Sequence, residues 1–311
     1  MSCEWPNFSN VAVRIRDYTR GKTYELAELC EYEFMCDFLW SLRSQLGERF
    51  VQSKFLVYWK IDRRGFLDDV SEVQPIVDKR TVIFLLGDET ASVPSELAAR
   101  VGLIFKVHLQ QAAVGNVFYF PLGCPNSRGC DTSVIDADSR TTSVFFSGAL
   151  NKKRIGMYRG LIGCSPLLDY PLLACKKFLP DNLSWIVPGS RLLFTPSFGE
   201  GLNHAEYLKI LHQSKIALCP DGFVNRETFR HYEAMRAGCV VVTKKMPPVP
   251  MFSGAPLVEI EEWSEVKQLL RDLLRNESLV ADLQTQAANW WLQNGTPERV
   301  ARYVAEHMQL A

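Results

Sequence analysis

The sequence predicts an α/β protein of two domains, each built around a doubly wound, largely parallel sheet. At 311 residues the chain exceeds the usual size of one compact domain. Short apolar runs alternate with helical patterns along both halves, which indicates parallel strands joined by right-handed crossovers. Between the halves, residues 124–141 are polar, rich in Asn, Ser, Asp, Gly and Arg, and without hydrophobic period, as is typical of a linker.

Nine runs are predicted as buried strands, because each is short, apolar and bounded by turn residues. Four belong to the first half and begin at Phe55, Thr81, Val101 and Asn116. Five belong to the second half and begin at Ser143, Leu192, Lys215, Gly238 and Ala255. From Glu262 to Leu310, Leu and Trp recur at helical spacing, which predicts helices alone. We therefore expect one domain at residues 1–135, a second at 136–290, and a C-terminal helix at 291–311 that packs back on the first.

The amino-acid composition of the chain excludes several classes of function. Lys plus Arg equals Asp plus Glu, at 35 each, and no block of like charge stands out, so nucleic acid is not an expected partner. The N-terminal residues lack the pattern of a signal peptide, and no apolar stretch is long enough to span a bilayer. The nine scattered cysteines suit reduced thiols and show no zinc-ligand spacing. We expect a cytoplasmic protein, with at most peripheral contact at the inner face of a membrane.

The richest motif is the segment Lys215–Val242, which predicts a strand, a Pro-Asp-Gly turn, a helix and another strand. Ligands of parallel sheets lie beyond the carboxyl ends of strands, where this helix should begin near Asn225. Free amides and the dipole at a helix start favour a diphosphate. Arg226 and Arg230, about one turn apart, would add two cations. Glu233, one turn deeper, could accept both hydroxyls of a nucleotide ribose.

An ordinary ion pair between Arg230 and Glu233 is the competing interpretation. The small residues Ala234, Ala237 and Gly238 favour the binding interpretation, since they predict a helix that packs closely under the sheet and leaves its polar start at the crevice.

These residues also carry a family resemblance. SKIALCPDGF from Ser214, then Arg230-His231-Tyr232-Glu233-Ala234, then AGCVVV resemble the donor half of exostosin-type glycosyltransferases. The preceding HAEYLKILHQSK is similar to the same family. The resemblance implies the GT-B architecture of two Rossmann-like domains, with the nucleotide-sugar donor on residues 136–290 and the acceptor on residues 1–135. Thr228 departs from the family's usual serine but keeps a hydroxyl for phosphate contact.

A second motif, SVFFSGALNKKR from Ser143, places a basic helix start after a strand. The backbone of Gly148 is expected near phosphate, with Lys153 or Arg154 reaching toward it. It is similar to the first strand and loop of GT-B donor domains. A solvated basic helix start is the competing interpretation for either cation.

A third motif, TVIFLLGDE, ends in Asp88 and Glu89 at the carboxyl edge of the first sheet. An inverting transferase needs one general base for the acceptor hydroxyl, and either carboxylate suits that role. His108 is the second candidate, and a plain surface turn is the competing interpretation. Asp221 and His204 are further candidates for contacts with sugar hydroxyls or the diphosphate.

Metal ions and cofactors are not expected. The single Asp-x-Asp, at residues 136–138, lies in the predicted linker rather than after an apolar strand, so Arg and Lys side chains would neutralise the diphosphate instead. The predicted activity is transfer of a sugar, with UDP-sugar favoured, to a saccharide or lipid-linked glycan, with inversion at the anomeric carbon. A retaining transferase, a sugar-nucleotide epimerase and a non-catalytic partner of another transferase remain alternatives.

Overall fold

The computed structural model describes residues 4–18, 21–62, 73, 76–127, 136, 139–197 and 200–310. The chain divides into two compact units. Unit 1 comprises Met1–Asn126, Pro247–Ser253 and Gln293–Ala311, and unit 2 comprises Ser127–Met246 and Gly254–Leu292. Unit 1 therefore gathers three separate stretches of sequence.

The sheet of unit 1 is parallel apart from one short edge strand. Its strands are β1 (Val11–Asp17), β2 (Lys54–Asp62), β3 (Thr81–Asp88), β4 (Leu103–Lys106), β5 (Ala113–Val114) and β6 (Val117–Tyr119). They lie in the order β1-β2-β3-β4-β6-β5, with only β5 antiparallel. The α/β class is confirmed. The described strands follow the chain order across the sheet, except that β5 and β6 form a hairpin at its edge.

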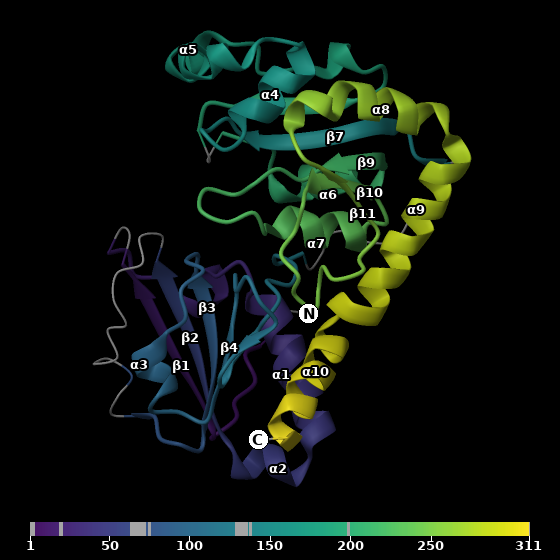
Figure 1. Ribbon diagram of the computed structural model, residues 1–311. Coiled ribbons are helices and arrows are strands. Elements are labelled where there is room, and N and C mark those ends of the chain that lie inside the picture. Colours follow the sequence, from purple (N-terminus) through teal and green to yellow (C-terminus); the bar gives the residue numbers. More distant parts are fainter. Residues whose placement is uncertain are drawn as a thin grey trace. The chain divides into compact units, whose positions relative to one another are not determined.

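Two helices distant in sequence cover one face of this sheet. The helical elements of unit 1 are η1 (Leu26–Glu28), α1 (Tyr32–Leu46), α2 (Glu48–Gln52), α3 (Ser95–Ala98) and α10 (Pro297–Leu310). Helix α1 packs against α10 (Figure 1). Phe38 of α1 meets Phe84 of β3 edge to face at 5.0 Å, and Tyr303 of α10 meets Phe105 of β4 at 6.2 Å. The aromatic core thus joins the chain's two ends within unit 1.

The sheet of unit 2 is parallel and doubly wound. Its strands are β7 (Thr142–Ala149), β8 (Arg191–Thr195), β9 (Ser214–Leu218), β10 (Val240–Lys244) and β11 (Leu257–Ile260). The order β11-β10-β9-β7-β8 means that the chain moves outward from β7 to β8 and then returns to β9 on the other side of β7. The direction of winding therefore reverses between β7 and β9, which is where doubly wound sheets bind ligands.

Helices cover both faces of this second sheet. They are α4 (Ile155–Ile162), η5 (Pro166–Leu168), α5 (Asp169–Ala174), η6 (Lys176–Phe178), η7 (Ser184–Ile186), α6 (His204–His212), α7 (Phe229–Arg236), η8 (Trp263–Glu265), α8 (Val266–Arg275) and α9 (Glu277–Trp290). A π-helical turn, Trp291–Gly295, leads into α10. Helix α4 passes so close to η8 that a methyl group on Gly160 would collide with the Trp263 carbonyl. No described helix is long and apolar enough to cross a membrane.

Candidate functional site

Two arginines converge on one glycine at the reversal point of the unit 2 sheet. Gly148 lies near the end of β7, and a methyl group placed on it would come 2.5 Å from Nη2 of Arg230 and 3.1 Å from Nη1 of Arg154. Arg154 directly precedes α4, which follows β7, and Arg230 belongs to α7, which follows β9. The missing side chain at Gly148 is what leaves room for both guanidinium groups.

Each guanidinium group is fixed by the backbone around it. Arg230 Nη2 donates to the Ser147 carbonyl at 2.8 Å, and the group lies 5.5 Å from the ring centre of Phe146. Arg154 is buried and donates to the carbonyls of Asp221 and Ala149, both at 3.1 Å. The Nε of Arg230 is buried and has no hydrogen-bond partner among the described residues. Two fixed cations with an unused donor form an anion-binding arrangement.

The charges of Arg154 and Arg230 also favour an anion at this position. Burial, together with the neighbouring charge of Arg230, lowers the pKa of Arg154 to about 9. Arg154 therefore stays cationic at neutral pH, although the charge of Arg230 destabilises its charged form. An anion placed between them would relieve this repulsion.

Glu233 is the acidic member of the cluster and follows Arg230 by one turn of α7. It is buried, and burial raises its pKa to about 7, although the charge of Arg230 and a hydrogen bond from Tyr207 act in the opposite direction. Tyr207 belongs to α6, and its ring lies 5.2 Å from that of Phe145 on β7. Arg230 thus lies within electrostatic reach of Glu233, and Tyr207 is the hydrogen-bond partner of this carboxylate.

The predicted helix start at Asn225 is wrong. Helix α7 begins at Phe229, because Thr228 caps it: its hydroxyl lies 3.1 Å from Nδ1 of His231, and its N–H donates to the same atom at 3.3 Å. Asn225 lies in the preceding loop, where its carbonyl accepts from the Gly222 N–H at 2.7 Å. His231 occupies the position where Glu or Gln is usual in a capping box, so no capping-box sequence marks this helix start.

Two of the predicted cations stand apart from the pair at Gly148. Arg226 precedes the helix, so it does not share a helical face with Arg230. It donates to the Lys245 carbonyl and lies 3.5 Å from the Asp221 carboxylate. Lys153 is exposed in the turn before α4. Their contact with a donor stays a prediction, as does the proposed phosphate contact of Thr228.

Asp88 and Glu89 follow β3 at the carboxyl end of the unit 1 sheet. Asp88 is buried, and its Oδ1 accepts from the hydroxyl of Thr90 at 2.6 Å and from its N–H at 2.9 Å. Its Oδ2 lies 3.4 Å from Nζ of Lys106 and 3.9 Å from Nζ of Lys60. Asp88 therefore holds a buried polar network together, whereas Glu89 is partly exposed.

His108 shows a distinctive backbone in the same unit. It follows β4, is buried, and has a φ of 62°, the one positive φ outside glycine among the described residues. Such strain persists only where surrounding structure imposes it, and it is common at functional sites. The buried Glu31, whose pKa is raised by burial, lies within electrostatic reach of His108. His108 stays the second candidate base.

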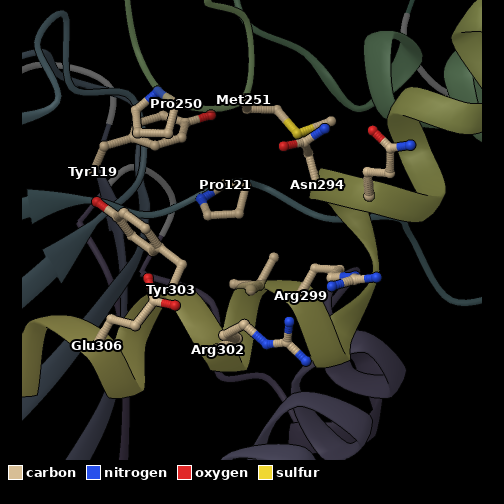
Figure 2. Close-up of a pocket in the computed structure, with 11 residues that line it drawn as sticks. Tyr119, Pro121, Pro250, Met251, Asn294, Arg299, Arg302, Tyr303 and Glu306 are labelled. Carbon is tan, nitrogen blue, oxygen red and sulfur yellow. The ribbon is translucent and has the colours of Figure 1, made fainter.

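A separate pocket of about 190 Å³ lies within unit 1 (Figure 2). Three stretches line it: Tyr119 and Pro121 at and just after the end of β6, Pro250 and Met251, and the face of α10 that carries Arg302, Tyr303 and Glu306. None of the residues predicted to bind the donor or to act as base lines this pocket. No local sequence pattern predicts this pocket, because its lining comes from three stretches that are far apart in the chain.

Within the described ranges, no group of three or more His, Cys, Asp or Glu side chains is arranged to hold a metal ion. Of the Asp-x-Asp at 136–138, only Asp136 is among the described residues.

Part of the second half of the chain matches the model of a known family. Residues 200–296 match the family model described as the RXYLT1 C-terminal domain. This match confirms the resemblance to exostosin-type glycosyltransferases over a segment that includes Tyr207, Arg230 and Glu233. None of the curated proteins matches the sequence.

Solved structures show distant likeness. The crystal structure of Anabaena Alr3699/HepE in complex with UDP has 10% identity and a TM-score of 0.47, over 97% of this chain and 100% of that one. The structure of TarM has 12% identity and a TM-score of 0.44, over 82% of this chain and 50% of that one. The pneumococcal O-GlcNAc transferase GtfA, in complex with UDP and GlcNAc, has 11% identity and a TM-score of 0.39, over 78% and 59%. Scores below 0.5 do not establish an activity for this chain, which spans half the length of TarM.

Proposed function

We propose that the chain is a glycosyltransferase that binds a nucleoside-diphosphate sugar, with UDP-sugar favoured, through unit 2. The observation that carries this proposal is the pair of fixed guanidinium groups on either side of Gly148, at the reversal point of a doubly wound sheet. Arg154 and Arg230 would hold the diphosphate, and Glu233 would accept the ribose hydroxyls. The family match over residues 200–296 supports the same assignment.

The proposed reaction is a single displacement. An acceptor hydroxyl oxygen bonds to the anomeric carbon, the bond from that carbon to the phosphate oxygen breaks, and the nucleoside diphosphate leaves with the electron pair. A carboxylate of unit 1 takes the hydroxyl proton. Of the two candidates we favour Glu89, because it is partly exposed to solvent, whereas Asp88 is buried. The arginines would balance the charge of the leaving group without a metal ion.

The acceptor is proposed to be a saccharide held by unit 1. The pocket beside α10 offers a guanidinium group, a carboxylate and aromatic rings, which together suit sugar hydroxyls and a sugar face. We expect Glu306→Ala to raise the KM for the acceptor and to leave the Kd for UDP unchanged. An unchanged KM would remove this pocket from the proposal.

Turnover by the purified chain alone tests the proposed activity. A panel of UDP-, GDP- and dTDP-sugars is incubated with saccharide acceptors, with and without a chelator, and released nucleotide is measured. We expect turnover with a UDP-sugar, insensitivity to the chelator, and an inverted product by NMR. Loss with the chelator would contradict metal independence, and a retained product would contradict the assignment of Glu89.

A non-catalytic partner subunit is the second candidate. It is favoured by the engagement of Asp88 in a structural network, which leaves one acid of the predicted pair. No turnover by the chain alone, together with turnover restored in another transferase when the chain is added, would favour it.

A further inference from the structure

The segment between α4 and β8 exposes an unusual set of large apolar side chains. Four of them form what we call the exposed apolar group: Leu167, Tyr170, Phe178 and Trp185, with exposed fractions of 88%, 83%, 88% and 74%. All four lie on the short helical elements η5, α5, η6 and η7, of which η5 and α5 contact α4. Single exposed leucines are ordinary, but this many large apolar residues in one connection mark an interaction surface.

The same segment already uses its other side to build the core. Leu183 and Val187 are buried in the core of unit 2, and Leu172, Leu179 and Ile186 pack against it. The exposed apolar group is therefore not an unfilled part of that core. The segment therefore has apolar side chains on its inner and on its outer side. The outer side chains need a second apolar surface to cover them.

The charges around the group are mainly positive. Lys177 and Arg191 are exposed, and Asp181 is the exposed acid of the segment. Asp169 is neutralised by Arg159, whose Nε lies 2.6 Å from its carboxylate. Aromatic and aliphatic side chains beside lysine and arginine have the composition of a surface that enters the interface of an anionic bilayer.

The protruding shape of the group favours a bilayer over a second protein. Large side chains of this kind bury about 150 to 250 Å² each, so four of them offer roughly 600 to 1,000 Å² at most. A stable protein interface buries about 800 Å² per partner, across a flat and complementary patch. Four protruding side chains suit a fluid surface that closes around them.

We propose that the exposed apolar group inserts into the interfacial layer of a membrane that contains anionic lipid, with Lys177 and Arg191 at the headgroups. This surface would hold unit 2, which carries the proposed donor site, at the membrane. The inference does not rest on the proposed transferase activity, because none of the donor-site residues takes part.

Vesicle flotation of the full chain tests this inference. Vesicles of phosphatidylcholine, with and without phosphatidylglycerol, are compared for the wild type and for the triple variant Leu167→Ser, Tyr170→Ser, Phe178→Ser. We expect binding to the anionic vesicles and a loss of at least roughly tenfold in the triple variant, since three inserted side chains are removed. Val51→Ser with Leu292→Ser is the matched control, because these residues are 61% and 59% exposed outside the group.

A charge variant covers the case in which the triple variant does not fold. Lys177→Glu should weaken binding to anionic vesicles, whereas Lys79→Glu, exposed in unit 1, should not. Absence of wild-type binding to vesicles, or equal binding by folded triple variant and wild type, would overturn the proposal. So would a wild-type dimer, measured by light scattering, that the triple variant abolishes, since the group would then be a protein interface.

Discussion

Glu233 is the residue on which the donor site depends most. Its carboxylate is buried beside a cation and a phenol, and burial raises its pKa to about 7. At neutral pH it is close to half protonated, so a ligand that donates hydrogen bonds would draw it to the ionised form. A nucleotide ribose presents two such donors. The site can therefore couple donor binding to proton release.

The free energy of unfolding of the protein without ligand should depend on the protonation of the Glu233 carboxylate. The native pKa of Glu233 lies above its ordinary value of 4.5, so between pH 4.5 and about 7 the folded chain holds a proton that the unfolded chain releases. The free energy of unfolding from this group therefore falls as pH rises through that range. Glu233→Gln should remove the loss and gain up to about 3 kcal/mol over the wild type at pH 8, measured by urea unfolding.

His231 also contributes to the pH dependence of the wild-type unfolding free energy, but it does not affect the difference between the wild type and Glu233→Gln. Burial lowers the pKa of His231 to about 4, so its contribution to stability is lost as pH falls below about 6.5, opposite in sign to that of Glu233. Because both proteins contain His231, their difference isolates Glu233. A difference that does not change with pH would show that Glu233 has an ordinary pKa.

Tyr207 is predicted to position Glu233. Its hydrogen bond lowers the pKa of Glu233, so Tyr207→Phe should raise that pKa and move the pH dependence of UDP affinity toward higher pH. The Kd is measured by titration from pH 6 to pH 8, and Tyr170→Phe, an exposed tyrosine, is the control. The phosphate of UDP also titrates near pH 6. Because this titration is the same for every variant, it does not affect the difference between their profiles. Identical profiles would leave Tyr207 with a packing role alone.

At the scale of elements, the close approach of α4 to η8 gives a matched pair of glycines. Gly160→Ala should cost about 1 to 3 kcal/mol of unfolding free energy, because the methyl group has no space beside the Trp263 carbonyl. Gly156→Ala, on the same helix, meets only Arg159 at 3.9 Å and should be neutral or stabilising by up to about 1 kcal/mol. Equal effects in urea unfolding would contradict this packing.

The elements also show what sequence reasoning could recover. The buried strands β2, β3, β7, β9 and β10 are continuous apolar runs and were all predicted. Strand β1 is not predicted, although Val11–Asp17 alternates apolar and polar residues, because its half-exposed edge position leaves no continuous run. The predicted start of α7 is too early because a histidine cap has no strong sequence signature, whereas Asn225 does.

At the scale of the whole molecule, contacts between distant segments account for what the sequence did not reveal. Arg230 and Glu233 share a helix, so their spacing was informative. Tyr207 and Gly148 reach them only through the strand order of unit 2, which local patterns do not specify. The pocket of unit 1 depends in the same way on α10 returning to the sheet.

A ligand that binds only the folded chain should raise its unfolding temperature. We expect UDP to raise the midpoint more than GDP, CMP or dTDP, and Arg154→Gln to abolish most of this shift. One charge-assisted contact is worth about 1.5 to 3 kcal/mol, or roughly ten- to a hundredfold in Kd. Arg271→Gln, exposed on α8, is the control. A full shift in the Arg154 variant would place the nucleotide elsewhere.

The most direct test of the donor site is a crystal structure of the chain with UDP. We predict that the diphosphate oxygens contact the guanidinium groups of Arg154 and Arg230 beside Gly148, and that Glu233 accepts hydrogen bonds from the ribose hydroxyls. UDP bound away from these three side chains, or a Glu233 carboxylate still bonded to Tyr207 with no contact to the ribose, would contradict the account.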